Sequence, residues 1–143
     1  MASIPNAVRP LIDAAFPEHV CLVGTVLSTG FAQITPRGSA QVYDDNHISI
    51  WERGRGTTTA LLADGTKVTV FYFNLGAREV LPIGGIVRFY GTASVHKSGP
   101  VYEKVWERLI EPEKQWDPDK KGWAVLVEVD RTENLLGQPL NID

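Results

Sequence analysis

The sequence is poor in the residues that form disulfides and metal sites. It holds one cysteine and three histidines among its 143 residues. A single cysteine cannot form an intramolecular disulfide, and the apolar run around Cys21 predicts that this side chain is a small buried hydrophobic group. His19, His47 and His96 lack the paired spacing of a helical metal site. Metal and thiol catalysis are therefore not expected.

An excess of positive charge is also absent. The chain has 14 Lys and Arg residues against 17 Asp and Glu residues, a net charge of -3. Without a global basic field, binding to nucleic acid or to an anionic membrane is not expected, and any anion site must be local. No apolar run reaches the roughly 18 residues that span a bilayer, and the N-terminus lacks a basic stretch followed by an apolar one. These absences predict a cytoplasmic protein.

What the chain does contain is typical of one globular domain. Hydrophobic residues make up 43% of the sequence and charged residues 22%, both close to the average of globular proteins. A chain of this length rarely splits into two cores. We therefore expect a single domain over residues 1–143, without repeats or linkers.

Hydrophobic spacing and turn residues predict a mainly β chain. Alternating apolar residues between Gly or Pro boundaries predict strands at 20–27, 31–35 with 41–43 (one strand bulged at 36–38), 47–51, 67–74, within 78–96, and 123–129. Apolar residues lie on both faces of 67–74, so both faces are expected to be covered. Helices are predicted at 7–16, about 58–63, and from Pro100 to a stop at Pro112. This order favours a closed antiparallel barrel with small inserted helices.

The segment 51–59 has the composition of an anion site. Arg53 and Arg55 offer fork-shaped donors, and the glycines beside them let backbone N–H groups approach a ligand. Thr57 and Thr58 lie where a helix is predicted to begin, so its dipole would add to the attraction. These donors predict a phosphate-binding site. The alternative is a basic surface turn with a threonine N-cap, because the spacing matches no dinucleotide or Walker fingerprint.

A second polar segment, 33–40, interrupts a predicted strand. Unpaired backbone groups at the predicted bulge could bind the polar edge of a heterocycle, and Arg37 could meet a negative charge. Gly38 is expected to supply positive φ and close ligand approach, whereas Ser39 is expected to act chiefly through its N–H. The alternative is a solvated bulge without a ligand.

The remaining polar and aromatic groups give weaker indications. The acidic residues around Pro112 and Pro118 are interpreted as solvated loops, and Asp44 with Asp45 as a pair that could in principle do acid–base work. Three tryptophans in the last third of the chain are interpreted as core or interface residues, or as a wall for a planar ligand; they are Trp106, Trp116 and Trp123.

Several short segments share their order and spacing with one family. They are 19–26 (HVCLVGTV), 33–39 (QITPRGS), 49–53 (SIWER), 67–70 (KVTV), 88–93 (RFYGTA) and 120–126 (KKGWAVL). Together they resemble the pyridoxamine 5'-phosphate oxidase-like, FMN-binding split-barrel family. The resemblance covers most of the chain.

The resemblance implies a six-stranded antiparallel split barrel that forms a homodimer, with FMN in clefts at the subunit interface. By position, the flavin ring would face the backbone around Thr35, Arg37, Gly38 and Ser39. Ser49 and Trp51 would line the ribityl chain, and Arg53, Arg55, Thr57 and Thr58 would hold the phosphate. Many relatives would place an Arg-Lys pair near positions 57 and 58, so here the two arginines would supply the charge.

These expectations lead to an FMN-dependent oxidoreductase in which the flavin carries the redox chemistry. The partner would be a small-molecule substrate or an electron acceptor, and its identity does not follow from the sequence. The C-terminus lacks the arginine-rich ending typical of true pyridoxamine phosphate oxidases, so that substrate is not carried over. The alternatives are a reductase that uses a deazaflavin in the same cleft, and a flavin- or haem-binding carrier or sensor without turnover.

Overall fold

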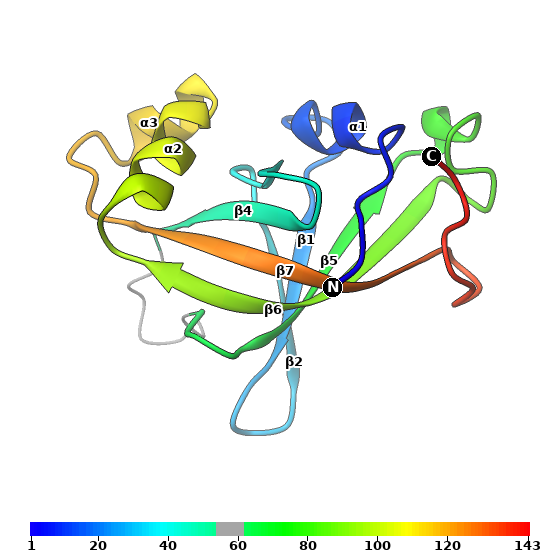
Figure 1. Cartoon of the computed structure of the whole chain (residues 1–143), viewed down its shortest axis with the longest axis horizontal. Helices are drawn as coiled ribbons and strands as arrows, with labels where there is room; N and C mark the ends of the chain where they lie inside the picture. The colour runs from blue at the N-terminus through cyan, green and yellow to red at the C-terminus, as the bar shows by residue number, and fades with distance from the viewer. Residues whose placement is uncertain (54–61) are drawn as a thin grey trace.

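The computed structural model describes residues 1–53 and 62–143, and these form a strongly curved sheet with short helices at its ends (Figure 1). The helical elements are α1 (Arg9–Asp13), the 3-10 helix η1 (Leu75–Ala77), α2 (Pro100–Arg108) and α3 (Glu111–Trp116). The strands are β1 (Leu22–Val26), β2 (Ala32–Pro36), β3 (Gln41–Val42), β4 (His47–Glu52), β5 (Lys67–Phe73), β6 (Ile86–His96) and β7 (Trp123–Glu133).

All neighbouring strands pair antiparallel, in the order β2-β1-β5-β6-β7-β4-β3. The two edge strands, β2 and β3, follow each other in the chain with only residues 37–40 between them. The five Cα–Cα steps from Pro36 to Gln41 span at most about 18 Å, so the sheet must curl until its edges meet at this turn. The fold is therefore the expected mainly β split barrel. Within the described residues it has seven strands, because the predicted bulged strand is two strands at opposite edges.

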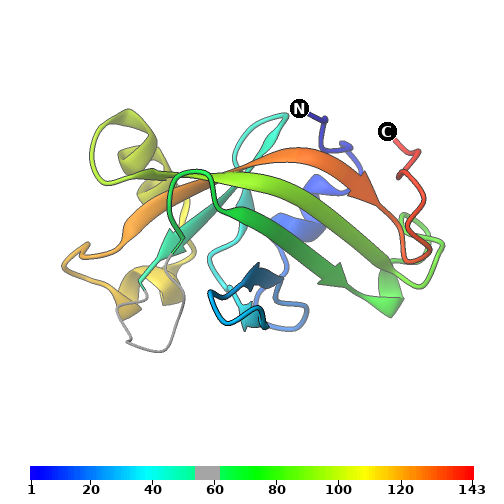
Figure 2. The same cartoon turned by 90° about the horizontal axis from the view of Figure 1, so that it is seen from below.

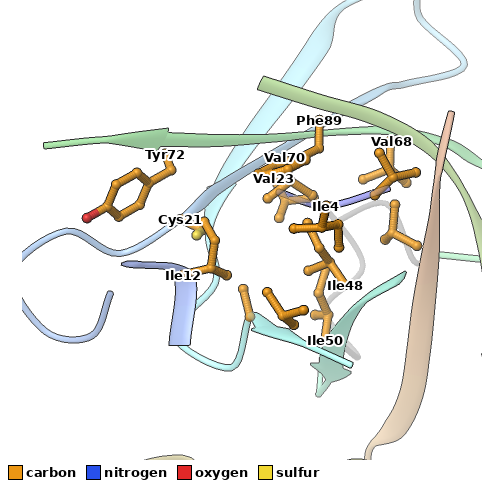
Figure 3. Packing of buried hydrophobic residues seen from close by; sticks show 14 of the residues in the cluster. Ile4, Ile12, Cys21, Val23, Ile48, Ile50, Val68, Val70, Tyr72 and Phe89 are labelled. Carbon is orange, nitrogen blue, oxygen red and sulfur yellow. The ribbon is translucent and has the colours of Figure 1, made fainter. Parts of the chain in front are cut away.

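The inward face of the curled sheet encloses the core. Alternate residues of β5 and β6, including Val70 and Phe89, are fully buried there, as period-2 spacing predicts. Figure 3 shows Ile12 of α1 and Ile48 of β4 pointing into the same interior. Cys21 also belongs to this core, which confirms it as a small buried hydrophobic group, and burial raises the pKa of its thiol to about 12.

Helix α1 is shorter than the predicted helix over 7–16. Pro10 has no N–H, which restricts it to the first turn, and the chain leaves the helix at Ala14. The apolar stripe itself is confirmed: Val8, Ile12 and Ala15 are buried and cover one end of the barrel core. The Asp13 carboxylate accepts the N–H of Val42 at 2.8 Å and so caps the short edge strand β3.

Helix α2 covers the outer face of the sheet at β4 and β7. Val105 and Leu109 pack there with Trp51 and Leu126 in a second apolar cluster. Both faces of this half of the sheet are therefore buried. Figure 2 shows β6 and β7 as long bent strands that run from this end of the molecule to the other.

Two sequence predictions need correction, and a third lies mostly outside the described residues. Pro112 does not end a helix that begins at Pro100: α2 ends at Arg108, and Pro112 lies in the first turn of α3, where proline is favoured. The outer face of β5 is not covered as its inner face is, since Thr69 and Phe71 are only half-buried. The predicted helix at 58–63 falls mostly outside the described residues, and positions 62 and 63 are not helical.

Candidate functional site

The turn that closes the barrel, residues 37–40, carries free backbone donors. The N–H of Arg37 donates to the Cys21 carbonyl at 2.8 Å, and that of Ala40 to the Arg37 carbonyl at 3.3 Å. The two N–H groups between them, on Gly38 and Ser39, make no hydrogen bond within the part of the chain that the structure describes. The predicted bulge is thus a turn between two strands, but it does leave backbone donors available for a ligand.

Gly38 and Ser39 line a pocket of about 360 Å³. Its walls come from the turn, from the end of β4 and from α3, which lies at the β4 and β7 end of the molecule in both views (Figures 1 and 2). The lining residues are Thr35, Pro36, Arg37, Gly38, Ser39, Trp51, Arg53 and Glu113. The structure therefore brings together most of the site residues inferred from sequence.

The other predicted site residues lie elsewhere. The Ser49 side chain is buried, donates to the Gln41 carbonyl at 3.4 Å and does not line the pocket. Arg55, Thr57 and Thr58 are outside the described residues.

Arg37 is held by an internal carboxylate. Its guanidinium donates two hydrogen bonds to Glu52 of β4, at 2.9 Å and 2.8 Å. The Glu52 side chain is only 1% exposed, so this bidentate pair lies inside the protein. The negative charge expected opposite Arg37 is therefore part of the fold, and the pair fixes the turn to the end of β4.

Ser39 acts through its side chain as well as its backbone. Its Oγ accepts the N–H of Trp51 at 3.0 Å, and both residues are buried. The interpretation that Ser39 matters chiefly through its own N–H is therefore incomplete. The hydroxyl ties the turn to β4 beside the Arg37–Glu52 pair.

Asp117 is a structural residue that the sequence analysis placed in a solvated loop. The carboxylate is buried and accepts hydrogen bonds from the Trp51 indole at 2.8 Å, the Lys121 N–H at 2.9 Å and the Gly122 N–H at 2.7 Å. It therefore fixes the orientation of Trp51 against the pocket. The sequence signal that could have found it is the following Lys121-Gly122 turn, whose N–H groups need an acceptor.

Glu113 was also predicted to be solvated, and it is buried in the pocket wall at 3% exposure. One of its carboxylate oxygens lies 3.9 Å from Nε of Arg53. Burial raises the pKa of Glu113, and the charges of Arg53 and Arg37 oppose that rise without cancelling it. Trp116, one turn along α3, lies beside the same arginine, whose guanidinium is 5.3 Å from the ring centroid.

Gly38 matters in the pocket because it has no side chain. Its φ is not positive, contrary to the sequence-based expectation. A Cβ at this position would lie 3.1 Å from the Glu113 carboxylate and 3.1 Å from the Phe16 ring. Glycine is therefore used here because the turn packs closely against α3.

The remaining candidates do not form a catalytic group. Asp44 contacts His47 at 2.7 Å while Asp45 pairs with Arg9, so the two carboxylates serve different partners. Among residues 1–53 and 62–143, no cluster of His, Cys, Asp or Glu could hold a metal ion. None of the helices in these ranges is long and apolar enough to cross a bilayer.

A larger, apolar groove of about 560 Å³ lies on the outer face of the sheet, away from this pocket. It is formed by β1, β2, β5 and β6, and its lining includes Leu22, Ile34 and Phe71. Ile34 is 67% exposed. This face is the uncovered side of β5 described above.

This chain was compared with protein families, curated proteins and solved structures, and only solved structures match it. No protein-family model and no curated protein matches the sequence. HupZ from Group A Streptococcus superposes with a TM-score of 0.66 over 96% of this chain and 98% of its own, at 25% identity. A candidate pyridoxamine 5'-phosphate oxidase from Lactobacillus delbrueckii superposes at 0.61, over 93% and 99%, with 21% identity. An FMN-binding protein from Syntrophomonas wolfei also superposes at 0.61, over 89% and 82%, with 16% identity.

These superpositions cover most of both chains in each pair, so they compare whole domains. Their low identities limit the conclusion to the architecture. The chain has the split-barrel fold of the pyridoxamine 5'-phosphate oxidase-like, FMN-binding proteins.

Proposed function

We propose that the protein binds FMN in the pocket at the 37–40 turn and acts as an FMN-dependent oxidoreductase on a small molecule. The observation that carries the proposal is that Arg53 lines one pocket with Gly38 and Ser39, whose N–H groups make no hydrogen bond within the described residues. A guanidinium and backbone N–H groups are the donors that suit a phosphate and the oxygen-bearing edge of a flavin. Proteins that share the fold include one described as FMN-binding.

The residues present fit such a group. Within residues 1–53 and 62–143, the Arg53 guanidinium makes no hydrogen bond: it lies 3.9 Å from Glu113 and 5.3 Å from the centre of the Trp116 ring, so its N–H groups are available to a ligand. The backbone donors of the turn are fixed because the Arg37–Glu52 and Ser39–Trp51 contacts hold the turn on β4. In this proposal the chain binds and orients the cofactor, and the bound flavin supplies hydride or electron transfer.

Arg53→Ala is expected to weaken FMN binding at least about tenfold, because a hydrogen bond to a charged group contributes roughly 1.5 to 3 kcal/mol. The measurement is a titration of flavin fluorescence at constant ionic strength. Riboflavin, which lacks the phosphate, should bind wild type and variant equally. The charge-matched control is Arg78→Ala, an exposed arginine that does not line the pocket.

The titrations distinguish a loss of phosphate binding from general damage to the pocket. A loss for FMN alone supports phosphate binding by Arg53. An equal loss for FMN and riboflavin means that the substitution damages the pocket as a whole. Unchanged FMN affinity in a folded Arg53→Ala variant contradicts the assignment of the phosphate site.

A reductase that uses a deazaflavin is the second candidate. An F420 reductase shares the fold with a TM-score of 0.58, at 15% identity, over 91% of this chain. The same pocket offers the same donors to either cofactor. Identifying the cofactor that copurifies distinguishes the two, because oxidised flavin gives a yellow protein with its own absorbance bands. A carrier or sensor would bind flavin and show no turnover.

We also propose that the protein is a homodimer that uses the apolar groove on the outer face of β1, β2, β5 and β6. The β1–β2 hairpin projects from the body of the molecule (Figure 1) and carries Val26, Phe31 and Ile34, which are 73%, 75% and 67% exposed. Such an apolar surface, beside a half-covered strand, is typical of a subunit interface.

Sedimentation at micromolar concentration is expected to show a species of two chains. Ile34→Asp should convert it to a single chain, because a charge in the centre of an apolar interface is not compensated. Thr29→Asp, at the hairpin tip and outside the groove lining, is the matched control. A wild-type protein that sediments only as one chain contradicts the dimer.

A further inference from the structure

The Glu113 carboxylate lies where the phosphate of the proposed ligand would also bring negative charge. Its buried carboxylate lines the pocket together with Arg37 and Arg53. A bound phosphate would therefore meet two arginines and one carboxylate. The carboxylate is a feature of the pocket wall, since its backbone belongs to α3.

The two acid–arginine contacts in the pocket differ in geometry. Glu52 holds Arg37 through two hydrogen bonds of 2.8 Å and 2.9 Å, the arrangement of a structural pair. Glu113 approaches Arg53 no closer than 3.9 Å, which is an ion-pair distance without a hydrogen bond. Arg53 is also the more exposed arginine, with 43% of its side chain accessible. The Glu113–Arg53 contact is thus the one that a ligand can replace.

The charged groups around Glu113 determine how a bound anion changes the protonation of its carboxylate. The charged groups that act on it are Arg53, just after β4, and Arg37 of the turn, which is paired with Glu52. Glu52 is already engaged by Arg37. The segment after α1 contributes Phe16, which has no charge. On α3 itself, the charged side chains are Glu111, Lys114 and, just after the helix, Asp117.

None of the charges on α3 replaces Arg53. Lys114 lies 3.9 Å from Glu111 and donates to the Glu107 carbonyl at 3.2 Å, so its ammonium is directed to other acceptors. Asp117 is engaged with Trp51 and with backbone N–H groups. Arg53 is thus the cation whose attraction for the Glu113 carboxylate a bound anion would weaken.

We propose that Glu113 sets the charge balance of this pocket: a phosphate group takes the place of the Glu113 carboxylate at Arg53, and Glu113 takes up a proton from solvent as the phosphate binds. The step forms one O–H bond on the carboxyl group and breaks one on a solvent hydronium or buffer acid. No other covalent change occurs. This inference rests on the proposed function, because it assigns a phosphate-bearing ligand to the same pocket.

The direction of the proton movement follows from electrostatics. Burial already raises the pKa of Glu113 in the absence of ligand. A phosphate beside it adds a like charge and engages Arg53, so both the new repulsion and the weakened attraction raise that pKa further. The folded protein with ligand therefore binds more protons near neutral pH than the protein and ligand do separately, and binding strengthens as the pH falls.

The test is calorimetry of FMN binding at pH 7.5 in two buffers that differ in their heat of ionisation. At this pH a phosphate monoester, with a second pKa of about 6, is already mostly dianionic, so proton uptake reports on the protein. Wild type is expected to take up a clearly measurable fraction of a proton. Glu113→Gln is expected to take up almost none and to bind FMN about tenfold more tightly, as a shift of one pKa unit implies.

Glu111→Gln is the matched control. It removes the same charge from the same helix, but the Glu111 side chain is 77% exposed. It should behave as wild type. If Glu113→Gln does not fold, uptake by the wild type alone decides, since absence of uptake overturns the proposal.

A second probe, inorganic sulfate, separates this inference from the flavin proposal because sulfate does not titrate near neutral pH. If FMN binds with equal proton uptake by wild type and Glu113→Gln, the role of Glu113 is overturned and flavin binding stands. If sulfate binds with Glu113-dependent uptake but FMN does not bind, the role of Glu113 stands and the flavin function falls. If neither probe binds, both are overturned.

Discussion

Asp117→Ala is expected to lower the free energy of unfolding by about 3 to 5 kcal/mol, a large effect for one substitution. The carboxylate accepts the Trp51 indole N–H and the backbone N–H groups of Lys121 and Gly122, at 2.7 to 2.9 Å. Removing it leaves these donors without that acceptor, and the two buried ones, on Trp51 and Gly122, each cost roughly 1 to 3 kcal/mol. The loss should also free Trp51 to reorient against the pocket.

Urea denaturation followed by circular dichroism measures the effect. Asp119→Ala is the control, because Asp119 is exposed in the same short segment and should change stability by less than about 0.5 kcal/mol. Asp117→Asn retains one acceptor oxygen and should lie between wild type and the alanine variant. A loss below about 1 kcal/mol for Asp117→Ala would mean that water replaces the carboxylate and that the network does not carry the fold.

Arg37→Ala is expected to cost about 3 to 5 kcal/mol, because it breaks a buried pair and leaves a carboxylate inside the protein. Glu52 is almost completely buried and receives both hydrogen bonds of the Arg37 guanidinium. The same substitution releases the 37–40 turn from β4, so the backbone donors of the pocket should lose their fixed positions. FMN affinity is therefore expected to fall even though Arg37 itself is occupied by Glu52.

The double variant Arg37→Met with Glu52→Leu distinguishes a charge effect from a packing effect. Replacing both members of a buried pair by apolar residues is often close to neutral, so stability should recover while the flavin site stays weakened. Arg9→Ala is the surface control: its partner Asp45 is 81% exposed, and such pairs contribute about 0 to 1 kcal/mol. If Arg37→Ala costs no more than Arg9→Ala, the closing turn does not depend on the Arg37–Glu52 pair.

Asp117 and Arg37 both support the junction between the two edge strands, β2 and β3. The pocket lies where the edge strands β2 and β3 of the sheet meet, and a few polar contacts hold that junction. Asp117 supports it from the α3 side and Arg37 from the β2 side. Both substitutions should therefore affect stability and ligand binding together, whereas Arg53→Ala should affect phosphate binding with little cost in stability.

The strands were predictable because their signal is local. Period-2 spacing places Val68, Val70 and Tyr72 on one face of β5, and that face is the buried one in the structure. The same reasoning located β1, β4 and β7 to within a few residues. Helix α1 was less predictable at its ends, because Pro10 limits the helix while the apolar stripe continues past it.

The site was predictable in part. The donors at Arg53, Gly38 and Ser39 were recognised from residue types that favour anions and close backbone approach, and the structure brings them to one pocket. The meaning of the interruption at Pro36 was missed. A kinked strand and a turn between two strands have the same local sequence signature, and only strand pairing distinguishes them.

The sequence by itself determined the strands, the buried thiol, the absence of a global basic charge and the composition of the proposed anion site, because these depend on residue type and short-range spacing. Only the tertiary structure decided that β2 and β3 are opposite edges of one curled sheet. It also decided that Glu113 and Asp117, acidic residues beside prolines, are buried. The physical reason is that burial and pairing depend on which surfaces the fold brings face to face. The partner of Asp117 at 2.8 Å, Trp51, lies 66 positions away, beyond the reach of any local pattern.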